Sequence, residues 1–316
     1  MKQQVLEFMR KGGDFEQLAL KLFAWQTAHI PHYARFCAGA TPQAVHEIPT
    51  VPVSLFRDLN LCASETPEAL FRTSGTTTGV RGIHRMPDTE VYDFAAQTWF
   101  EKCVALPTET QWISLVPNPQ STPDSSLGHM VATLAPQAQW FLQPQQGVEV
   151  PSALKAIEQA TRPLFIAATA LALADLLEAS PAKDLPPQST VMITGGYKGM
   201  HRAVSESELE AVTRERWGNK VQVVREYGMT ELSSQLWDTG EGYLAPPWLR
   251  VYAIDPATGR VSHETGLLCF VDLANWGSCL AIETQDMGRV EGQKVMLEGR
   301  LEHAALRGCS LTAEPS

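Results

Sequence analysis

The sequence predicts an α/β protein in which a mainly parallel sheet carries helices on its faces and a smaller β-rich lobe follows. Three observations support this fold class. Between residues 112 and 225, short apolar runs typical of strands alternate with segments of helical periodicity. After Gly240 the helical periodicity ends, and apolar runs are separated by Gly, Pro and Asn turns. The 316 residues can also bury a large core, in one big domain or in two unequal lobes.

The first third of the chain predicts two amphipathic helices. The first covers residues 14–30, because Asp14 can cap it, apolar residues recur at helical spacing and Pro31 ends it. The second begins at Pro87-Asp88 and presents an apolar face as far as Cys103. A glycine-rich segment precedes this second helix, and we expect it to form a loop between two strands.

The middle of the chain predicts strands and helices in alternation, as a parallel sheet requires. Strands are expected at 112–116, 139–142, 164–168, 190–194 and 221–225. Helices are expected at 126–135, 152–160, 171–179 and 205–217, the last with a capping box of Ser205 and Glu208. In the last third, strands are expected at 250–254, 267–272 and 294–298.

The charge balance excludes several classes of partner. The chain has 25 Lys and Arg against 35 Asp and Glu, a net charge of −10. This argues against nonspecific nucleic-acid binding and against attraction to anionic membranes. No apolar run approaches the roughly 18–20 residues of a membrane span, and no leader is recognisable, so we expect a cytoplasmic protein. The six cysteines include no pair at zinc-binding spacing, which favours free thiols.

Residues 71–85 concentrate groups that bind anions. This segment holds three glycines, five hydroxyl side chains, three arginines and one histidine. Its backbone N–H groups and hydroxyls suit the phosphates of a nucleotide, with His84 among the side chains that supply neutralising charge. The alternative is a flexible surface turn, and neither the P-loop nor the dinucleotide-binding pattern is present. The residues expected to contact phosphate are Thr73, Ser74, Gly75, Thr76, Thr77, Thr78, Gly79 and Arg81.

Two further motifs directly follow predicted strands. In an open α/β sheet the carboxyl ends of the strands face the ligand, so this position favours a site. Gly195, Gly196 and Tyr197 follow the strand at 190–194, and residues 226–231 follow the strand at 221–225. Either motif could be an ordinary strand-to-helix turn, and for the two glycines alone that alternative is favoured.

The glycine-rich loop resembles the Ser/Thr-Ser-Gly-Thr-Thr-Gly signature of adenylate-forming enzymes, the superfamily of acyl-CoA synthetases and luciferase-type ligases. In residues 73–79 one threonine is added, and Val80-Arg81 replaces the usual lysine. These departures indicate a divergent branch. His84 could take the place of that lysine at the phosphates.

Residues Tyr227, Gly228, Met229, Thr230 and Glu231 match the Tyr-Gly-x-Thr-Glu motif of the same superfamily residue for residue. The resemblance implies ATP and Mg²⁺ as cofactors and a reaction in which a carboxylate attacks the α-phosphate and pyrophosphate leaves. It implies that Tyr227 lies against the adenine, that Thr230 hydrogen-bonds the α-phosphate and that Glu231 holds Mg²⁺. One glutamate suffices, because Mg²⁺ normally takes one or two carboxylates plus phosphate oxygens.

Two later segments continue the motif order of the superfamily. Asp286, in Gln-Asp-Met-Gly-Arg, resembles the aspartate that accepts hydrogen bonds from the ribose hydroxyls. Arg300, in Leu-Glu-Gly-Arg-Leu, resembles the hinge that ends the large domain, which makes it a candidate ribose or phosphate contact. A lone Asp-x-Gly turn is common, so these assignments depend on the order of the motifs.

Only sixteen residues follow Arg300, whereas acyl-CoA synthetases continue into a further domain. The chain therefore more closely resembles the acyl-protein synthetase (LuxE-like) family of bacterial bioluminescence operons, which lacks that domain and carries an acyl-accepting cysteine near its C-terminus. Cys309 stands where this cysteine is expected; the alternative is an ordinary terminal cysteine. We expect an adenylating core at 1–240, a β-rich lobe of the same domain at 241–299, and a hinge with a short tail at 300–316.

The resemblance implies ATP-dependent activation of a carboxylic acid, a fatty acid in the bioluminescence family, followed by acyl transfer to Cys309 as a thioester. An acyl-CoA-reductase-like or carrier-protein partner is implied in the same way. One alternative is adenylation of a small or aryl acid for a separate carrier thiol. Another is a nucleotide-binding partner subunit without catalysis.

Overall fold

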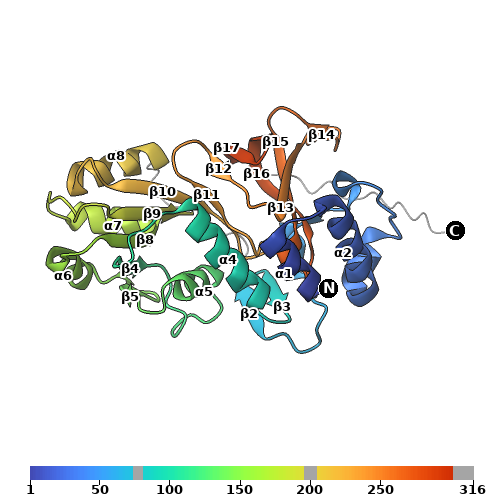
Figure 1. Cartoon of the computed structure of the whole chain (residues 1–316), viewed down its shortest axis with the longest axis horizontal. Coiled ribbons are helices and arrows are strands. Elements are labelled where there is room, and N and C mark those ends of the chain that lie inside the picture. Colours follow the sequence, from blue (N-terminus) through green and yellow to red (C-terminus); the bar gives the residue numbers. More distant parts are fainter. Residues whose placement is uncertain (74–80, 196–204, 302–316) are drawn as a thin grey trace.

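The structure is a computed structural model that describes residues 1–73, 81–195 and 205–301. A 13-stranded mixed sheet runs through the molecule, with helices α6, α7 and α8 at one end and α1 and α2 at the other (Figure 1). Along the main path the strands follow the order β14-β13-β15-β16-β17-β12-β11-β10-β9-β8-β4-β5, and β1 pairs with β16. The mixed α/β fold class is as the sequence predicts.

One half of the sheet is parallel. Strand β4 pairs in parallel with β5 and β8, β8 with β9, and β9 with β10. Helices lie on both faces of this half, because buried residues alternate along each strand: Leu164, Ile166 and Ala168 of β8 join one core, and Phe165 and Ala167 join the other. The strands are β4 (Gln111–Leu115), β5 (Gln139–Trp140), β8 (Leu164–Thr169), β9 (Thr190–Thr194) and β10 (Gln222–Tyr227).

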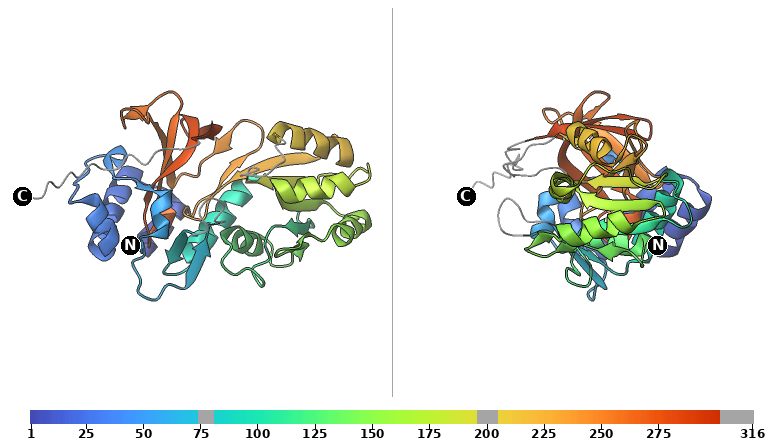
Figure 2. Two further views of the ribbon diagram at one scale, coloured as in Figure 1. Left: turned by 180° about the vertical axis from the view of Figure 1, so that it is seen from behind. Right: turned by 90° about the vertical axis from the view of Figure 1, so that its left-hand side faces the viewer.

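The helices of this half divide between the two cores. Residues of α6 (Val150–Gln159), α7 (Ala170–Ala179) and α8 (Glu206–Trp217) belong to the smaller core, and those of α4 (Glu90–Cys103) and α5 (Ser126–Leu134) to the larger core. Seen from behind, α6, α7 and α8 gather at the same end as the parallel strands (Figure 2).

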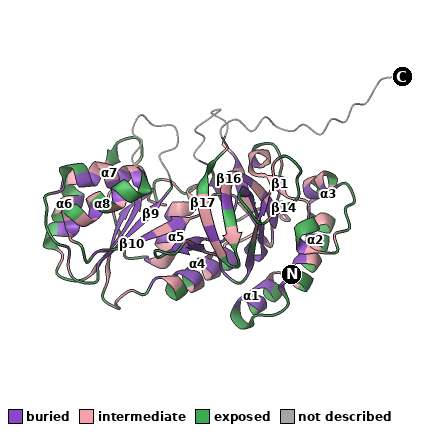
Figure 3. Ribbon diagram, turned by 90° about the horizontal axis from the view of Figure 1, so that it is seen from above, coloured by how far each residue is buried: buried purple, intermediate pink, exposed green. Residues whose placement is uncertain are grey.

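The other half of the sheet is antiparallel apart from the short strand β1, which runs parallel to β16. Viewed from above, its long strand β16 lies beside β17, between the parallel half and the N-terminal helices (Figure 3). Its strands are β1 (Val51–Pro52), β11 (Leu236–Asp238), β12 (Tyr243–Leu244), β13 (Leu249–Ile254), β14 (Val261–Ser262), β15 (Gly266–Asp272), β16 (Ala281–Glu291) and β17 (Lys294–Arg300).

Smaller elements complete the fold. Two hairpins stand apart from the main sheet: β2 (Ala69–Arg72) with β3 (Ile83–Met86), and β6 (Leu142–Gln143) with β7 (Gly147–Val148). The N-terminal helices are α1 (Lys2–Lys11), α2 (Phe15–His29) and α3 (Pro31–Cys37). Three 3₁₀ turns are η1 (Val45–Glu47), η2 (Val53–Arg57) and η3 (Leu273–Asn275). No helix in the described ranges is both long and apolar enough to cross a membrane.

Most expected elements match the structure. The expected cap of α2 is present, since the Asp14 side chain accepts a hydrogen bond from the backbone N–H of Gln17. The capping box of Ser205 and Glu208 at α8 is present as well. The strand–loop–strand arrangement around the glycine-rich loop is confirmed by the antiparallel pairing of β2 with β3.

Other expectations need correction. The single strand expected at 139–142 is wrong, because β5 pairs with β4 whereas β6 pairs with β7 in a separate hairpin. Helices α1 and α3 and strands β11, β12 and β16 were not expected from the sequence. The expected domain boundaries at 1–240, 241–299 and 300–316 stay a prediction.

Candidate active site

Strand β10 marks the change from the parallel to the antiparallel half of the sheet. It runs parallel to β9 on one side and antiparallel to β11 on the other. It ends at Tyr227, the first residue of the motif Tyr227-Gly228-Met229-Thr230-Glu231. Because ligands of open α/β sheets bind outside the carboxyl ends of the strands, this junction is the position that the fold favours for a site.

Three of the expected site residues meet at this junction. The Tyr227 hydroxyl donates a hydrogen bond of 2.8 Å to Oδ2 of Asp286 on β16. Asp286 lies opposite Arg300 in the β16–β17 pairing, and Arg300 Nε is 3.8 Å from Asp286 Oδ1. The Tyr227 ring also stacks on Phe270, with ring centroids 5.7 Å apart. Burial, followed by the neighbouring Asp286 carboxylate, raises the pKa of Tyr227, so its hydroxyl keeps its proton and remains a donor.

The backbone of Thr230 is held by His84, which lies on the glycine-rich hairpin formed by β2, the glycine-rich loop and β3. The imidazole of His84, on β3, is hydrogen-bonded through Nδ1 to the Thr230 carbonyl oxygen and through Nε2 to Ser278 Oγ, both at 2.7 Å. Burial lowers the pKa of His84 to about 4, so the ring is neutral at pH 7.

The expected role of His84 as a positive charge at the phosphates therefore needs correction. Its side chain is fully buried, and both ring nitrogens have protein partners. A neutral imidazole in this position can orient the Thr230 backbone but cannot neutralise a phosphate. The sequence shows a histidine beside a glycine-rich loop, and it does not show that the side chain points into the protein.

Glu231 follows in a turn that buried side chains fix in place. Its carbonyl oxygen accepts a hydrogen bond of 3.0 Å from Asn275 Nδ2, and its residue is only 7% exposed. No cluster of three or more His, Cys, Asp or Glu suited to a metal occurs among the residues that the structure describes. The assignment of the metal to Glu231 stays a prediction.

Thr73 and Arg81 close the neck of the glycine-rich loop. Thr73 N–H donates to the Gly82 carbonyl at 3.0 Å, and Gly82 N–H donates back to Thr73 Oγ1 at 2.9 Å. The Arg81 guanidinium donates to the Thr73 and Arg72 carbonyls and pairs with Asp124 at 2.9 Å. Both residues thus have structural partners at the base of the loop, and their phosphate contacts stay a prediction. Ser74, Gly75, Thr76, Thr77, Thr78 and Gly79 lie outside the described residues.

A buried glutamate that was not expected as a site residue lies beside these motifs. Glu226, the residue before Tyr227, pairs with Thr194 in the β9–β10 register, and the Thr194 hydroxyl donates to its Oε2. Burial raises the pKa of Glu226 to about 7. A Cβ at position 228 would lie 2.3 Å from Glu226 Oε1, so the motif needs Gly228 for this close approach. Its position directly after the strand expected at 221–225 was the only sequence signal for Glu226.

The remaining expected residues are placed as follows. Gly195 directly follows β9 with φ of +66°, a left-handed conformation that favours glycine. Met229 is partly buried against the larger core. Gly196, Tyr197 and Cys309 lie outside the described residues.

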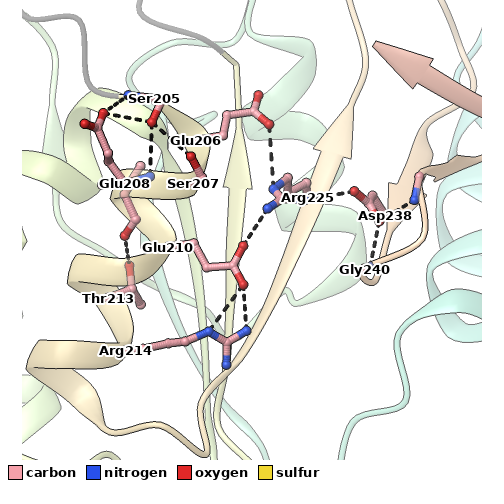
Figure 4. Close-up of polar contacts among 12 residues, drawn as sticks. Ser205, Glu206, Ser207, Glu208, Glu210, Thr213, Arg214, Arg225, Asp238 and Gly240 are labelled. Atoms are coloured by element: carbon pink, nitrogen blue, oxygen red, sulfur yellow. Dashed lines mark hydrogen bonds and ion pairs between the residues drawn. The ribbon is translucent and has the colours of Figure 1, made fainter. Parts of the chain in front are cut away.

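On the opposite face of β10, an ion-pair network joins the strand to α8 (Figure 4). Arg225 pairs with Asp238, its neighbour on β11, at 3.0 Å, and with Glu210 and Glu206 of α8. Glu210 also pairs with Arg214 one turn further along the helix. Because successive residues of a strand point to opposite faces, Arg225 fixes β10 to α8 while Glu226 faces the other side.

Comparisons with known proteins bear on the fold. No family model matches the sequence, and no curated protein matches it. In structure, the chain is similar to a long-chain-fatty-acid-CoA ligase from Archaeoglobus fulgidus, with a TM-score of 0.54 and 14% identity over 75% of this chain and 52% of that one. It is also similar to an ATP-bound RpMatB-BxBclM chimera, with a TM-score of 0.53 and 15% identity over 74% of this chain and 48% of that one.

A third similar structure is a double mutant of o-succinylbenzoate CoA synthetase from Bacillus subtilis bound to a product analogue. Its TM-score is 0.51, with 19% identity over 75% of this chain and 50% of that one. The chain thus spans about half the length of these three proteins. At these identities the likeness concerns the fold, which is the one expected for the large domain of adenylate-forming enzymes.

Proposed function

We propose that this chain activates a carboxylic acid with ATP, forming an acyl-adenylate and releasing pyrophosphate. The observation that carries the proposal is the meeting of Tyr227, Asp286 and Arg300, residues from three strands, at the carboxyl end of β10. The sequence motifs assign these three residues to one nucleotide, and Asp286 lies within 4 Å of both Tyr227 and Arg300. The shared fold with acid-CoA ligases supports the same proposal.

In the proposed reaction an oxygen of the substrate carboxylate attacks the α-phosphorus of ATP. The bond from that phosphorus to the bridging oxygen of the β-phosphate breaks, and the electron pair leaves with pyrophosphate. Asp286 accepts hydrogen bonds from the ribose hydroxyls, Tyr227 lies against the adenine and Thr230 donates to the α-phosphate. Glu231 holds Mg²⁺, which when bound neutralises charge on the pyrophosphate.

We further propose that the acyl group passes to Cys309. The thiolate sulfur attacks the acyl carbon, the carbon–oxygen bond to AMP breaks and AMP leaves, which gives a thioester for a reductase-like or carrier partner. A fatty acid is the proposed substrate class.

The first step is tested by acid-dependent exchange of pyrophosphate into ATP, with a panel of acids from acetate to long-chain and aryl acids. Exchange with at least one acid is expected, together with its loss in Asp286→Ala. ATP binding without exchange on any acid would favour a nucleotide-binding subunit that lacks catalysis.

The second step is tested by intact mass after incubation with ATP, Mg²⁺ and the active acid. A hydroxylamine-labile adduct is expected in the wild type and in Cys103→Ser, a control in the half-buried cysteine of α4, but not in Cys309→Ser. Exchange without any adduct would instead indicate a separate carrier thiol as the acceptor.

A further inference from the structure

We infer that His84 and Asn275 form a carbonyl clamp, a pair of buried donors that hold two successive carbonyl groups and so orient Thr230 and Glu231 for adenylation. His84 Nδ1 lies 2.7 Å from the Thr230 carbonyl oxygen, and Asn275 Nδ2 lies 3.0 Å from that of Glu231. This inference rests on the proposed function, and His84 and Asn275 are positioning residues within it.

Hydrogen-bond chemistry fixes the tautomer of His84. A carbonyl oxygen can only accept, so Nδ1 carries the proton and donates it to Thr230. The other nitrogen, Nε2, then has a lone pair and accepts from the Ser278 hydroxyl at 2.7 Å. Ser278, whose hydroxyl can donate or accept, thus accommodates the tautomer that the Thr230 carbonyl requires.

The orientation of the Asn275 amide is determined in the same way. The backbone N–H of Ser233 donates at 3.0 Å to one atom of the amide, which must therefore be the oxygen Oδ1, and the Ser233 hydroxyl donates to the same atom at 2.6 Å. The nitrogen then faces the carbonyls of Glu231 and Cys279, at 3.0 and 2.8 Å. All four polar contacts of Asn275 are satisfied, so the amide has one stable orientation.

Burial makes the clamp rigid. His84, Asn275 and Ser278 are each at most 2% exposed, so water cannot replace their hydrogen bonds. With both carbonyls fixed, the peptide planes on either side of Glu231 have little freedom. These planes determine the direction of the Glu231 Cα–Cβ bond and restrict that of Thr230. When groups that contact a transition state are misplaced by about 1 Å, the reaction rate can fall by about 100-fold.

The clamp also connects segments far apart in the sequence. His84 lies on β3, the strand that returns from the glycine-rich loop, whereas Asn275 and Ser278 lie between β15 and β16. The turn after β10 is held between these two segments. A shift of the glycine-rich hairpin would therefore move Thr230 as well.

Two substitutions of His84 distinguish the effect of its hydrogen bond to Thr230 from the effect of its packing in the core. In His84→Asn the amide nitrogen can occupy the position of Nδ1 and keep the donor to Thr230. In His84→Gln the amide lies one atom further out, near Nε2, and that donor is lost. His46→Gln, at an exposed histidine of η1, is the matched control.

The experiment compares these variants in pyrophosphate exchange, in thermal unfolding and in amide hydrogen exchange at residues 231–233. We expect His84→Asn and His46→Gln to keep kcat within about 3-fold, and His84→Gln to lose about 10- to 100-fold in kcat with a smaller change in KM for ATP. The amides of 231–233 should exchange faster in His84→Gln than in His84→Asn.

Equal kcat values in His84→Asn and His84→Gln, whether both high or both low, would overturn the clamp. If the wild type shows no pyrophosphate exchange with any acid, the proposed adenylation is overturned instead. In that case hydrogen exchange alone decides on the clamp, and equal protection of residues 231–233 in the two variants would overturn it.

Discussion

The two halves of the sheet are stabilised in different ways. In the parallel half, β8 and β9 are buried on both faces, and aliphatic and aromatic side chains pack against helices on either side. Around the antiparallel half, buried polar side chains bond to the backbone of other elements, as Asp272 and Asn275 do with the turn after β10. The halves meet at β10, so the candidate site has an apolar framework on one side and a hydrogen-bonded one on the other.

This comparison predicts the largest stability loss in the parallel half. Phe165 is fully buried, with its ring centroid 4.1 Å from that of Trp112 and 5.4 Å from that of Phe100. We expect Phe165→Ala to reduce the free energy of unfolding by about 3–5 kcal/mol, because it leaves a cavity among rigid neighbours. Urea denaturation measures the loss, with the 41% exposed Leu70→Ala as control. A loss below about 1 kcal/mol would mean that this half is not held by close apolar packing.

The second prediction concerns pH and lies at the junction. Burial raises the pKa of Glu226 from 4.5 to about 7, so the folded protein binds this proton more tightly than the unfolded chain does. Stability from this group is therefore complete below about pH 4.5 and is lost as the pH rises through about 7. Glu226→Gln cannot ionise and avoids this loss.

The stability of Glu226→Gln relative to wild type should thus increase with pH over this window, by up to about 3 kcal/mol at ~1.36 kcal/mol per pKa unit. Urea denaturation at pH 4.5, 6 and 8 measures the difference. His84 has a lowered pKa, so its contribution to stability changes with pH in the opposite direction. This contribution is the same in the wild type and in Glu226→Gln, and it cancels in their difference. A difference that stays constant with pH would show that the Glu226 carboxyl titrates normally.

The third prediction concerns the polar network. The Ser234 hydroxyl donates to Asp272 Oδ1 at 2.8 Å and accepts from Trp248 Nε1 at 3.0 Å. Ser234→Ala leaves the buried indole N–H without this acceptor, so we expect a loss of about 2 kcal/mol in unfolding free energy although almost no volume is removed. Ser121→Ala, at an exposed serine, should change it by less than about 0.5 kcal/mol. Equal small effects in both variants would contradict a stabilising role of the network.

The same contrast explains what the sequence could predict. In the parallel half, β8 and α7 differ from their expected ranges only at the ends, because βα alternation and apolar periodicity are local signals. The strand β16 was not expected because Ala281–Glu291 contains Gly288 and several polar residues, and a register shift at Met287/Gly288 interrupts its pairing with β17. Its strand conformation depends on neighbours distant in sequence.

The candidate site divides in the same way. Tyr227, Asp286 and Arg300 could be predicted because motif residues and their order are present in the sequence. The partners Asn275 and Ser278 could not, since an asparagine and a serine in a connection carry no periodicity or motif. His84 was recognised as a site candidate, but its inward direction depends on the pairing of β3 and on the burial of both ring nitrogens.

The smallest predicted effect concerns the contact that bridges the two halves. Tyr227 on β10 donates to Asp286 on β16, and in Asp286→Asn the amide oxygen can still accept that hydrogen bond. The proposed hydrogen bonds from the ribose lose their charged acceptor, so we expect ATP affinity to fall about tenfold, or ~1.4 kcal/mol. Isothermal titration calorimetry with ATP and Mg²⁺ measures the change. Tyr227→Phe keeps the carboxylate and removes only the bridge, so if it weakens ATP binding more than Asp286→Asn does, the bridge rather than the ribose contact sets the affinity.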